Sequence, residues 1–187
     1  MLISKFKKSD ELLNIKEFET RLNINLPQQY IIFMQKYNGG ESPDTIWSGK
    51  GKCDIRGFYG INTSNRNWDI EENLKYDRYN ELLLQKMLPI AENSFCDLFC
   101  INCMDGSIWL TYHESDKKIR IANEFNEFVA KCKSKRIGHI STIEERKERL
   151  FANGHEDKLS DAMVRGWQAE IDKYANIVQE EVELTSV

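Results

Sequence analysis

The sequence contains little proline and glycine and no long apolar run. Only 3 Pro and 10 Gly occur among 187 residues, which excludes a collagen-like repeat or a disordered chain rich in these residues. No run of about 18 apolar residues occurs that could cross a bilayer, and residues 1–8 lack the apolar core and cleavage site of a secretion signal. We therefore expect a folded cytoplasmic protein without a membrane partner.

Paired cysteines and excess positive charge are also missing. The five cysteines are odd in number and irregularly spaced, which suits a reducing compartment better than a disulfide framework. The net charge is −4 at pH 7, the wrong sign for binding nucleic acid through phosphate neutralisation. The composition thus predicts no direct nucleic-acid binding and favours a basic partner.

No motif of a known catalytic class occurs in the chain. A nucleophile elbow, a P-loop, a dinucleotide fingerprint and an HExxH sequence are all absent. His113-Glu114 could act as an acid and base pair, but a structural turn is the first interpretation and a partner contact the second. Because no spacing indicates a nucleophile, a base and an orienting group together, we expect that the protein is not an enzyme and binds no cofactor.

The first 90 residues alternate between helical and strand-like patterns. A helix is predicted after Ser9, and a second one from Pro27 to Tyr37, ended by two glycines. Short strands are indicated at 46–47 and 55–59, and a helix from Trp68 to Gln85 that ends at the following Leu-Pro-Ile.

Strand-like runs dominate the middle of the chain. Three of them span 95–103, 107–113 and 118–122, and Asp105-Gly106 between the first two is a strong hairpin signal. A helix is predicted from Phe125. The sequence thus predicts an α+β fold with a mainly antiparallel β-sheet flanked by helices, over residues 1–132.

Residues 133–187 are predicted to form a C-terminal helical extension. A basic run from Lys133 to Arg136 is interpreted as a solvated linker, and Ser141 with Glu144 fits a capping box. An apolar stripe then follows helical spacing, through Leu159, Met163, Trp167, Ile171, Tyr174, Val178 and Val182. Because such a stripe is too apolar to stay solvated, we expect it to pack on the body or on a second copy of the chain.

An ordered series of landmarks carries a family resemblance. They are Phe18-Glu19, Leu26-Pro27-Gln28-Gln29-Tyr30, Tyr37-Asn38-Gly39-Gly40, Leu88-Pro89-Ile90-Ala91, Tyr112-His113-Glu114 and Phe125-Asn126-Glu127-Phe128. In this order, over about Leu12 to Cys132, the series resembles the SUKH superfamily of bacterial immunity proteins and fungal cell-wall regulators. The resemblance implies an α+β scaffold for protein recognition.

One position departs from the family pattern. Where the family usually has a Gly-Asp pair before the central strand, this chain has Cys96-Asp97. The turn at this point is therefore expected to differ, and Asp97 need not keep its usual setting. Trp109, in the strand before His113, fits the family's apolar position near the centre of the sheet.

Acidic and aromatic residues between the second helix and the sheet are the first candidates for partner binding. The candidates are Glu41, Asp44, Trp47, Trp68, Asp69, Glu71, Glu72 and, at the end of the strand-like run 107–113, His113 and Glu114. Aromatic side chains are enriched in binding hot spots, and acidic ones steer a basic partner. The alternative is that the aromatics, with Tyr59, are core and that the acids solvate the surface.

The resemblance implies an immunity protein that neutralises a cognate polymorphic toxin, often a nuclease or deaminase, by direct binding. A basic toxin domain is then the expected protein partner. The alternative is a regulatory scaffold that binds signalling or wall-synthesis proteins. A neighbouring gene for a large secreted protein with a C-terminal toxin domain would favour immunity, and its absence the scaffold.

Metal independence is the first testable prediction. Cys100 and Cys103 lie three residues apart in a predicted strand and so point to opposite faces, where they cannot easily chelate one ion. Elemental analysis of the purified protein should find no stoichiometric zinc, and a chelator should leave the melting temperature unchanged. One zinc per chain would contradict this interpretation.

Overall fold

The computed structural model describes residues 1–6, 13–175 and 177–184 and divides the chain into two compact units. The first unit comprises Met1–Arg136 with Gln179–Val187, and the second comprises Ile137–Val178. The predicted helix start at Ser9 and the nearby Leu12 lie outside the described residues. None of the described helices has the length and apolar character needed to cross a membrane.

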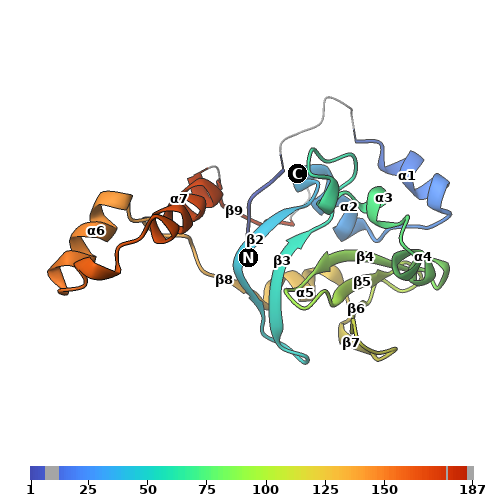
Figure 1. The fold of residues 1–187 in the computed structure, drawn as a ribbon. Helices are drawn as coiled ribbons and strands as arrows, with labels where there is room; N and C mark the ends of the chain where they lie inside the picture. Colours follow the sequence, from blue (N-terminus) through green and yellow to red (C-terminus); the bar gives the residue numbers. More distant parts are fainter. Residues whose placement is uncertain (7–12, 176, 185–187) are drawn as a thin grey trace. The chain divides into compact units, whose positions relative to one another are not determined.

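A seven-stranded antiparallel sheet forms the centre of the first unit (Figure 1). The strand order is β7-β6-β5-β4-β3-β2-β8. The strands are β2 (Gly40–Trp47), β3 (Cys53–Phe58), β4 (Met87–Glu92), β5 (Leu98–Asn102), β6 (Ile108–Thr111), β7 (Lys118–Ala122) and β8 (Cys132–Ser134). Every neighbouring pair is antiparallel, and with the flanking helices this confirms the predicted α+β class.

The sheet is curled, so that the tip of the β2–β3 hairpin approaches β6 and β7. Gly51 in this tip has φ +73°, and a Cβ there would lie 2.8 Å from Ile119 Cδ1 and 3.2 Å from Leu110 Cδ2. Only glycine combines that backbone conformation with so close an approach.

Short helices cover the sheet. They are α1 (Ile15–Leu22), α2 (Gln28–Tyr37), the 3₁₀ turn η1 (Arg66–Trp68), α3 (Ile70–Asn73), α4 (Asp77–Leu84) and α5 (Phe125–Lys131). Rings from α2 and α5 meet rings from the strands: Phe33 lies 5.3 Å from Phe58, and Phe128 lies 5.3 Å from Trp47 and 5.4 Å from Phe99. Tilted and edge-on aromatic pairs at these distances add to the burial of apolar surface.

Two predicted elements differ from the structure. The helix expected from Trp68 to Gln85 is broken into η1, α3 and α4. The Leu-Pro-Ile run read as its end belongs to β4, of which five residues from Met87 to Ala91 are buried. A short buried strand gives no alternating pattern, and its pairing with β3 and β5 decides its conformation.

The end of the chain returns to the first unit. A two-residue strand β1 (Leu2–Ile3) pairs with β9 (Glu180–Glu181), and the neighbouring Val182 is buried. The predicted apolar helix therefore does not extend to Val182. It ends at Ala175, and Val182 belongs to the core of the first unit.

The second unit consists of α6 (Ile143–Ala152), the turn η2 (Glu156–Lys158) and α7 (Asp161–Ala175). The capping box of α6 is formed one residue later than predicted. Glu145 N–H donates to Thr142 Oγ1 at 3.2 Å, and Thr142 N–H donates to the Glu145 carboxylate at 2.8 Å. An ion pair of 2.7 Å between Arg146 and Glu170 joins the two helices.

Neither helix of the second unit has a buried side chain. The stripe on α7, with Met163, Trp167, Ile171 and Tyr174, is half-buried. That this stripe packs on the body or on a second copy stays a prediction.

Backbone strain at one turn position generates a stability prediction. Cys96 has φ +60°, in the left-handed region that costs a residue with a Cβ about 1–2 kcal/mol. The turn thus has a backbone conformation that glycine adopts freely. Cys96→Gly should relieve the strain, offset by about 0.5–1 kcal/mol because glycine gives the unfolded chain more freedom.

We therefore expect Cys96→Gly to raise the free energy of unfolding by about 0.5–1 kcal/mol, measured by urea denaturation. The control is Glu114→Gly, at an exposed turn residue that does not have a positive φ, which should lower stability by about 0.5–1 kcal/mol. A lower midpoint for Cys96→Gly than for the parent protein would contradict the strain argument.

Candidate partner-binding surface

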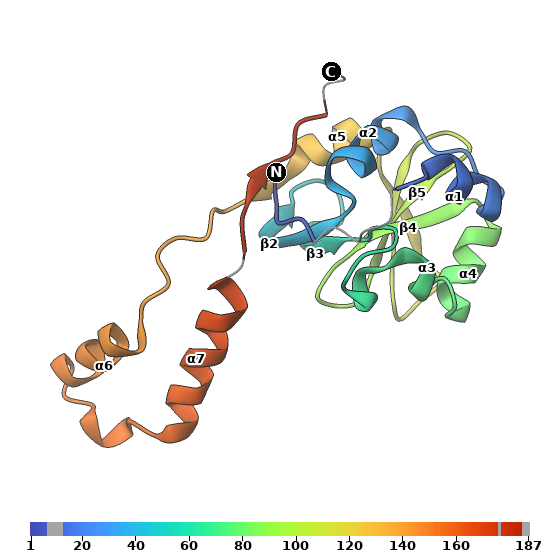
Figure 2. The same ribbon diagram turned by 90° about the horizontal axis from the view of Figure 1, so that it is seen from above.

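Three turns meet at one end of the sheet. Antiparallel strands reverse direction at each connection, so the turns at 48–52, 93–97 and 112–117 lie at the same end, and the β5–β6 turn lies at the other. Figure 2 gives a second view of the strands that these turns connect. Loops held in this way by a rigid scaffold commonly carry binding residues.

The side chain of Asn93 closes the β4–β5 turn. Asn93 is 0% exposed, and its Oδ1 accepts hydrogen bonds from the backbone N–H groups of Phe95 and Asp97, both at 2.9 Å. Its Nδ2 donates to Asp97 Oδ2 at 3.0 Å, and its backbone N–H donates to the Asp97 carbonyl at 3.1 Å. A buried amide with both ends satisfied holds the turn in a single conformation.

Groups from neighbouring elements fix the turn from outside. The His113 N–H donates to Asp97 Oδ1 at 2.7 Å, and the Ser94 N–H donates to Asp54 Oδ2 at 3.0 Å. Arg78 on α4 donates to the carbonyl of Cys96 at 2.7 Å, and its Nη1 lies 3.3 Å from His113 Nδ1. Hydrogen bonds thus join α4, the β4–β5 turn and the β6–β7 turn.

A polar network beneath α4 anchors the helix. Tyr59 O–H lies 2.8 Å from the hydroxyl of Tyr79 on α4 and donates to Glu92 at 2.7 Å, and Glu92 also pairs with Arg56 at 3.1 Å. Burial raises the pKa of both tyrosines above the ordinary value, so their hydroxyls stay protonated. They serve as hydrogen-bonding groups that position α4.

An aromatic side chain projects from this fixed framework. Phe95 is 74% exposed, and Tyr76, at the N-terminal end of α4, is 66% exposed. We use the name "turn surface" for Tyr76, Arg78, Phe95, Cys96 and His113. Aromatic and arginine side chains are enriched among residues that dominate binding energy, and a turn that is already ordered loses little entropy on binding.

Three of the sequence-predicted partner residues are core residues. Trp47 is 0% exposed, and its indole N–H donates to the Lys50 carbonyl at 2.8 Å. Trp68 is buried beside Tyr59 at a ring distance of 5.5 Å. Asp69 is buried as the N-cap of α3 and accepts from the backbone N–H of Glu71 at 3.0 Å. Trp47 and Trp68 are thus core residues, as in the alternative interpretation of the sequence, and Asp69 is a buried capping residue instead of a surface contact.

The predicted acidic residues between 41 and 72 are not among the residues that form the turn surface. Glu41 is half-buried and bonds through its backbone to Ser4, and Asp44 is exposed. Glu71 forms an ion pair with Arg21.

Glu72 is also paired. It contacts Lys75 at 2.6 Å and Arg66 at 2.9 Å, and the hydrogen bonds from these two groups lower its pKa. Two of the acids expected to steer a partner are therefore largely neutralised within the protein.

The predicted pair His113-Glu114 is exposed, and His113 belongs to the turn surface. Sequence reasoning did not find Arg78, Asn93 or Phe95. The available signal was Asn93-Ser94 before Phe95, because asparagine commonly bonds to the backbone two residues on in a turn. The sequence predicts a strand from residue 95 instead, whereas β5 begins at Leu98.

The two cysteines of the Cys100-Ile101-Asn102-Cys103 run occupy ordinary packing positions. Cys100 is buried and Cys103 half-buried, and burial raises the pKa of these thiols to about 12 and about 11. Among the residues that the structure describes, no group of three His, Cys, Asp or Glu side chains is arranged to hold a metal ion.

Comparison with known proteins identifies the family of residues 12–131. The family model for the SMI1 / KNR4 family (SUKH-1) matches residues 12–131. The SPbeta prophage-derived uncharacterized protein YokK of Bacillus subtilis (strain 168) is 29% identical over 139 residues, which cover 62% of this chain and 70% of that protein. The matched region contains the sheet from β2 to β7 and all of the turn surface. The chain belongs to the SMI1 / KNR4 family (SUKH-1).

Proposed function

We propose that this protein is an immunity protein that binds a cognate toxin domain, a nuclease or deaminase, and blocks it without performing chemistry. Family membership supports an immunity or regulatory role. The toxin and the mode of blocking are our proposal.

The observation that carries the proposal is the preformed turn surface. Phe95 stands exposed on a turn that Asn93 closes from inside and that Arg78 and His113 join to neighbouring elements. Such an arrangement suits tight binding of a protein, because an apolar anchor is displayed while the groups around it are already ordered.

The net charge of the whole chain indicates which charge its partner should have. A net charge of −4 favours a basic toxin domain, and a domain that handles a polyanionic substrate tends to be basic. Because Glu71 and Glu72 are already paired with cations, steering by the segment 41–72 should be weaker than its acid content indicates.

Titrating the toxin tests the proposal. Where a neighbouring gene encodes a secreted protein with a C-terminal toxin domain, that domain is expressed and assayed, and the purified protein is added in increasing amounts. We expect inhibition that is complete near one protein per toxin. Phe95→Ala should weaken binding at least about 30-fold, as for a central anchor worth about 2 kcal/mol.

The control is Met104→Ala, which removes an apolar side chain of similar exposure, 78% against 74%. Met104 follows β5 and so lies at the opposite end of that strand from Phe95. It should bind the toxin like the parent protein. An active toxin in the presence of excess protein would refute the proposed function, and equal affinities of the two variants would remove the turn surface from the interface.

A further inference from the structure

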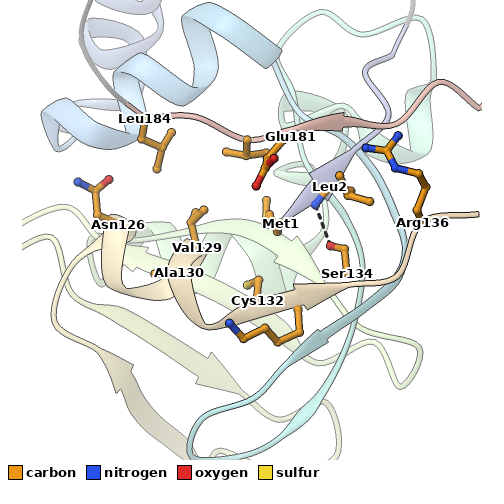
Figure 3. Close-up of a pocket in the computed structure, with 12 residues that line it drawn as sticks. Met1, Leu2, Asn126, Val129, Ala130, Cys132, Ser134, Arg136, Glu181 and Leu184 are labelled. Atoms are coloured by element: carbon orange, nitrogen blue, oxygen red, sulfur yellow. Dashed lines mark hydrogen bonds between the residues drawn. The ribbon is translucent and has the colours of Figure 1, made fainter.

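A groove runs beside the edge strand β8 in the first unit, and none of its lining residues belongs to the turn surface (Figure 3). Its volume is about 640 Å³. One wall comes from α5 and β8, and the other from β1 and the segment after β9. Asn126 and Leu184 lie at one end and Arg136 at the other, so the groove is elongated.

The end of the groove at Asn126 combines apolar surface with an unpaired acceptor. Val129, Val182 and Leu184 line the walls. Asn126 Oδ1 is buried and has no hydrogen-bond partner among the residues that the structure describes. A buried polar atom without a partner costs free energy, so a ligand that supplies an N–H donor to this oxygen would bind more tightly.

The other part of the groove carries unpaired positive charge in a chain of net charge −4. Lys133 and Arg136 line the groove and Lys135 lies between them in sequence. Within the described ranges, none of these three forms an ion pair. Residues 133–136, predicted from sequence to be a solvated linker, thus contribute an edge strand and a cationic wall.

The edge strand offers backbone groups as well. On one side, β8 and its flanking residues face β2. The Ser48 N–H, just after β2, donates to the Lys131 carbonyl at 3.2 Å, and the Lys135 N–H donates to the Asp44 carbonyl at 3.0 Å. Because directions alternate along a strand, the backbone N–H and C=O of Ser134 point away from β2, toward the free edge. Leu2 N–H uses only the Ser134 hydroxyl, at 2.8 Å.

We propose that this groove binds a short extended segment of a partner protein that carries an acidic side chain close to an apolar one. The apolar side chain occupies the wall at Val129 and Leu184, the acid pairs with Lys133 and Arg136, and a backbone N–H reaches Asn126 Oδ1. Glu181 on the opposite wall accepts a second backbone N–H. Backbone pairing provides affinity and the side-chain positions provide specificity, as in other strand-like peptide complexes.

This binding goes beyond the proposed immunity function and is independent of it. A phage-displayed library of random dodecapeptides, selected on the full chain, supplies the probes. We expect enriched peptides to share an acidic residue next to an apolar one. Fluorescence polarisation then measures the affinity of the enriched peptides for purified variants.

Two variants change the groove at exposed positions. Lys133→Glu with Arg136→Glu should weaken peptide binding at least about tenfold by reversing the charge of one wall. Ala130→Trp, at an exposed α5 residue that lines the groove, should do the same by filling it. Unfolding midpoints within error of the parent protein show that either variant is folded.

Two controls separate this site from the rest of the surface. Lys16→Glu with Lys52→Glu makes the same change of charge at exposed lysines elsewhere, and Phe95→Ala alters the turn surface. Both should bind the peptides within about twofold of the parent protein. The proposal fails if no peptide is enriched, or if enriched peptides bind both groove variants as tightly as the parent protein.

Discussion

The buried side chain of Asn93 is the constraint on which the recognition end of the sheet depends. Its two polar atoms bond to Phe95, Asp97 and the Asp97 carboxylate, and Asp97 in turn holds the β6–β7 turn through His113. A short chain of hydrogen bonds therefore sets where Phe95 projects. Because the Asn93 side chain is buried and both of its polar atoms are hydrogen-bonded, it favours one conformation of the turn instead of several.

The strand order of the curled sheet explains where the residues that we propose for binding gather. Antiparallel pairing brings three turns to one end, while the strand order leaves β8 as an edge. The aromatic cluster around Phe128 fills the interior with rings from helices and strands, so the large aromatics of the acidic segment are used for stability. The two surfaces that we propose for recognition are the displayed turn at one end of the sheet and the cationic groove at one edge.

Sequence patterns predicted what local chemistry decides. The α+β class, the helix ending at Asn38 and the meander with Asp105-Gly106 follow from periodicity and turn residues. Strand β4 and the contacts of the turn with other elements do not follow from the sequence pattern. A short buried strand resembles the end of a helix, and the bonds from Arg78 to Cys96 and from His113 to Asp97 join residues far apart in the chain. Charge alone also pointed to Glu71 and Glu72, whose partner cations only the fold reveals.

The central claim is that the β4–β5 turn is already ordered in the free protein. Backbone ¹⁵N relaxation of the amides of residues 94–97 tests it most directly. The hydrogen bonds of Asn93 predict order parameters of about 0.85, as in rigid backbone. Values below about 0.6 would show a flexible turn and would contradict a preformed turn surface.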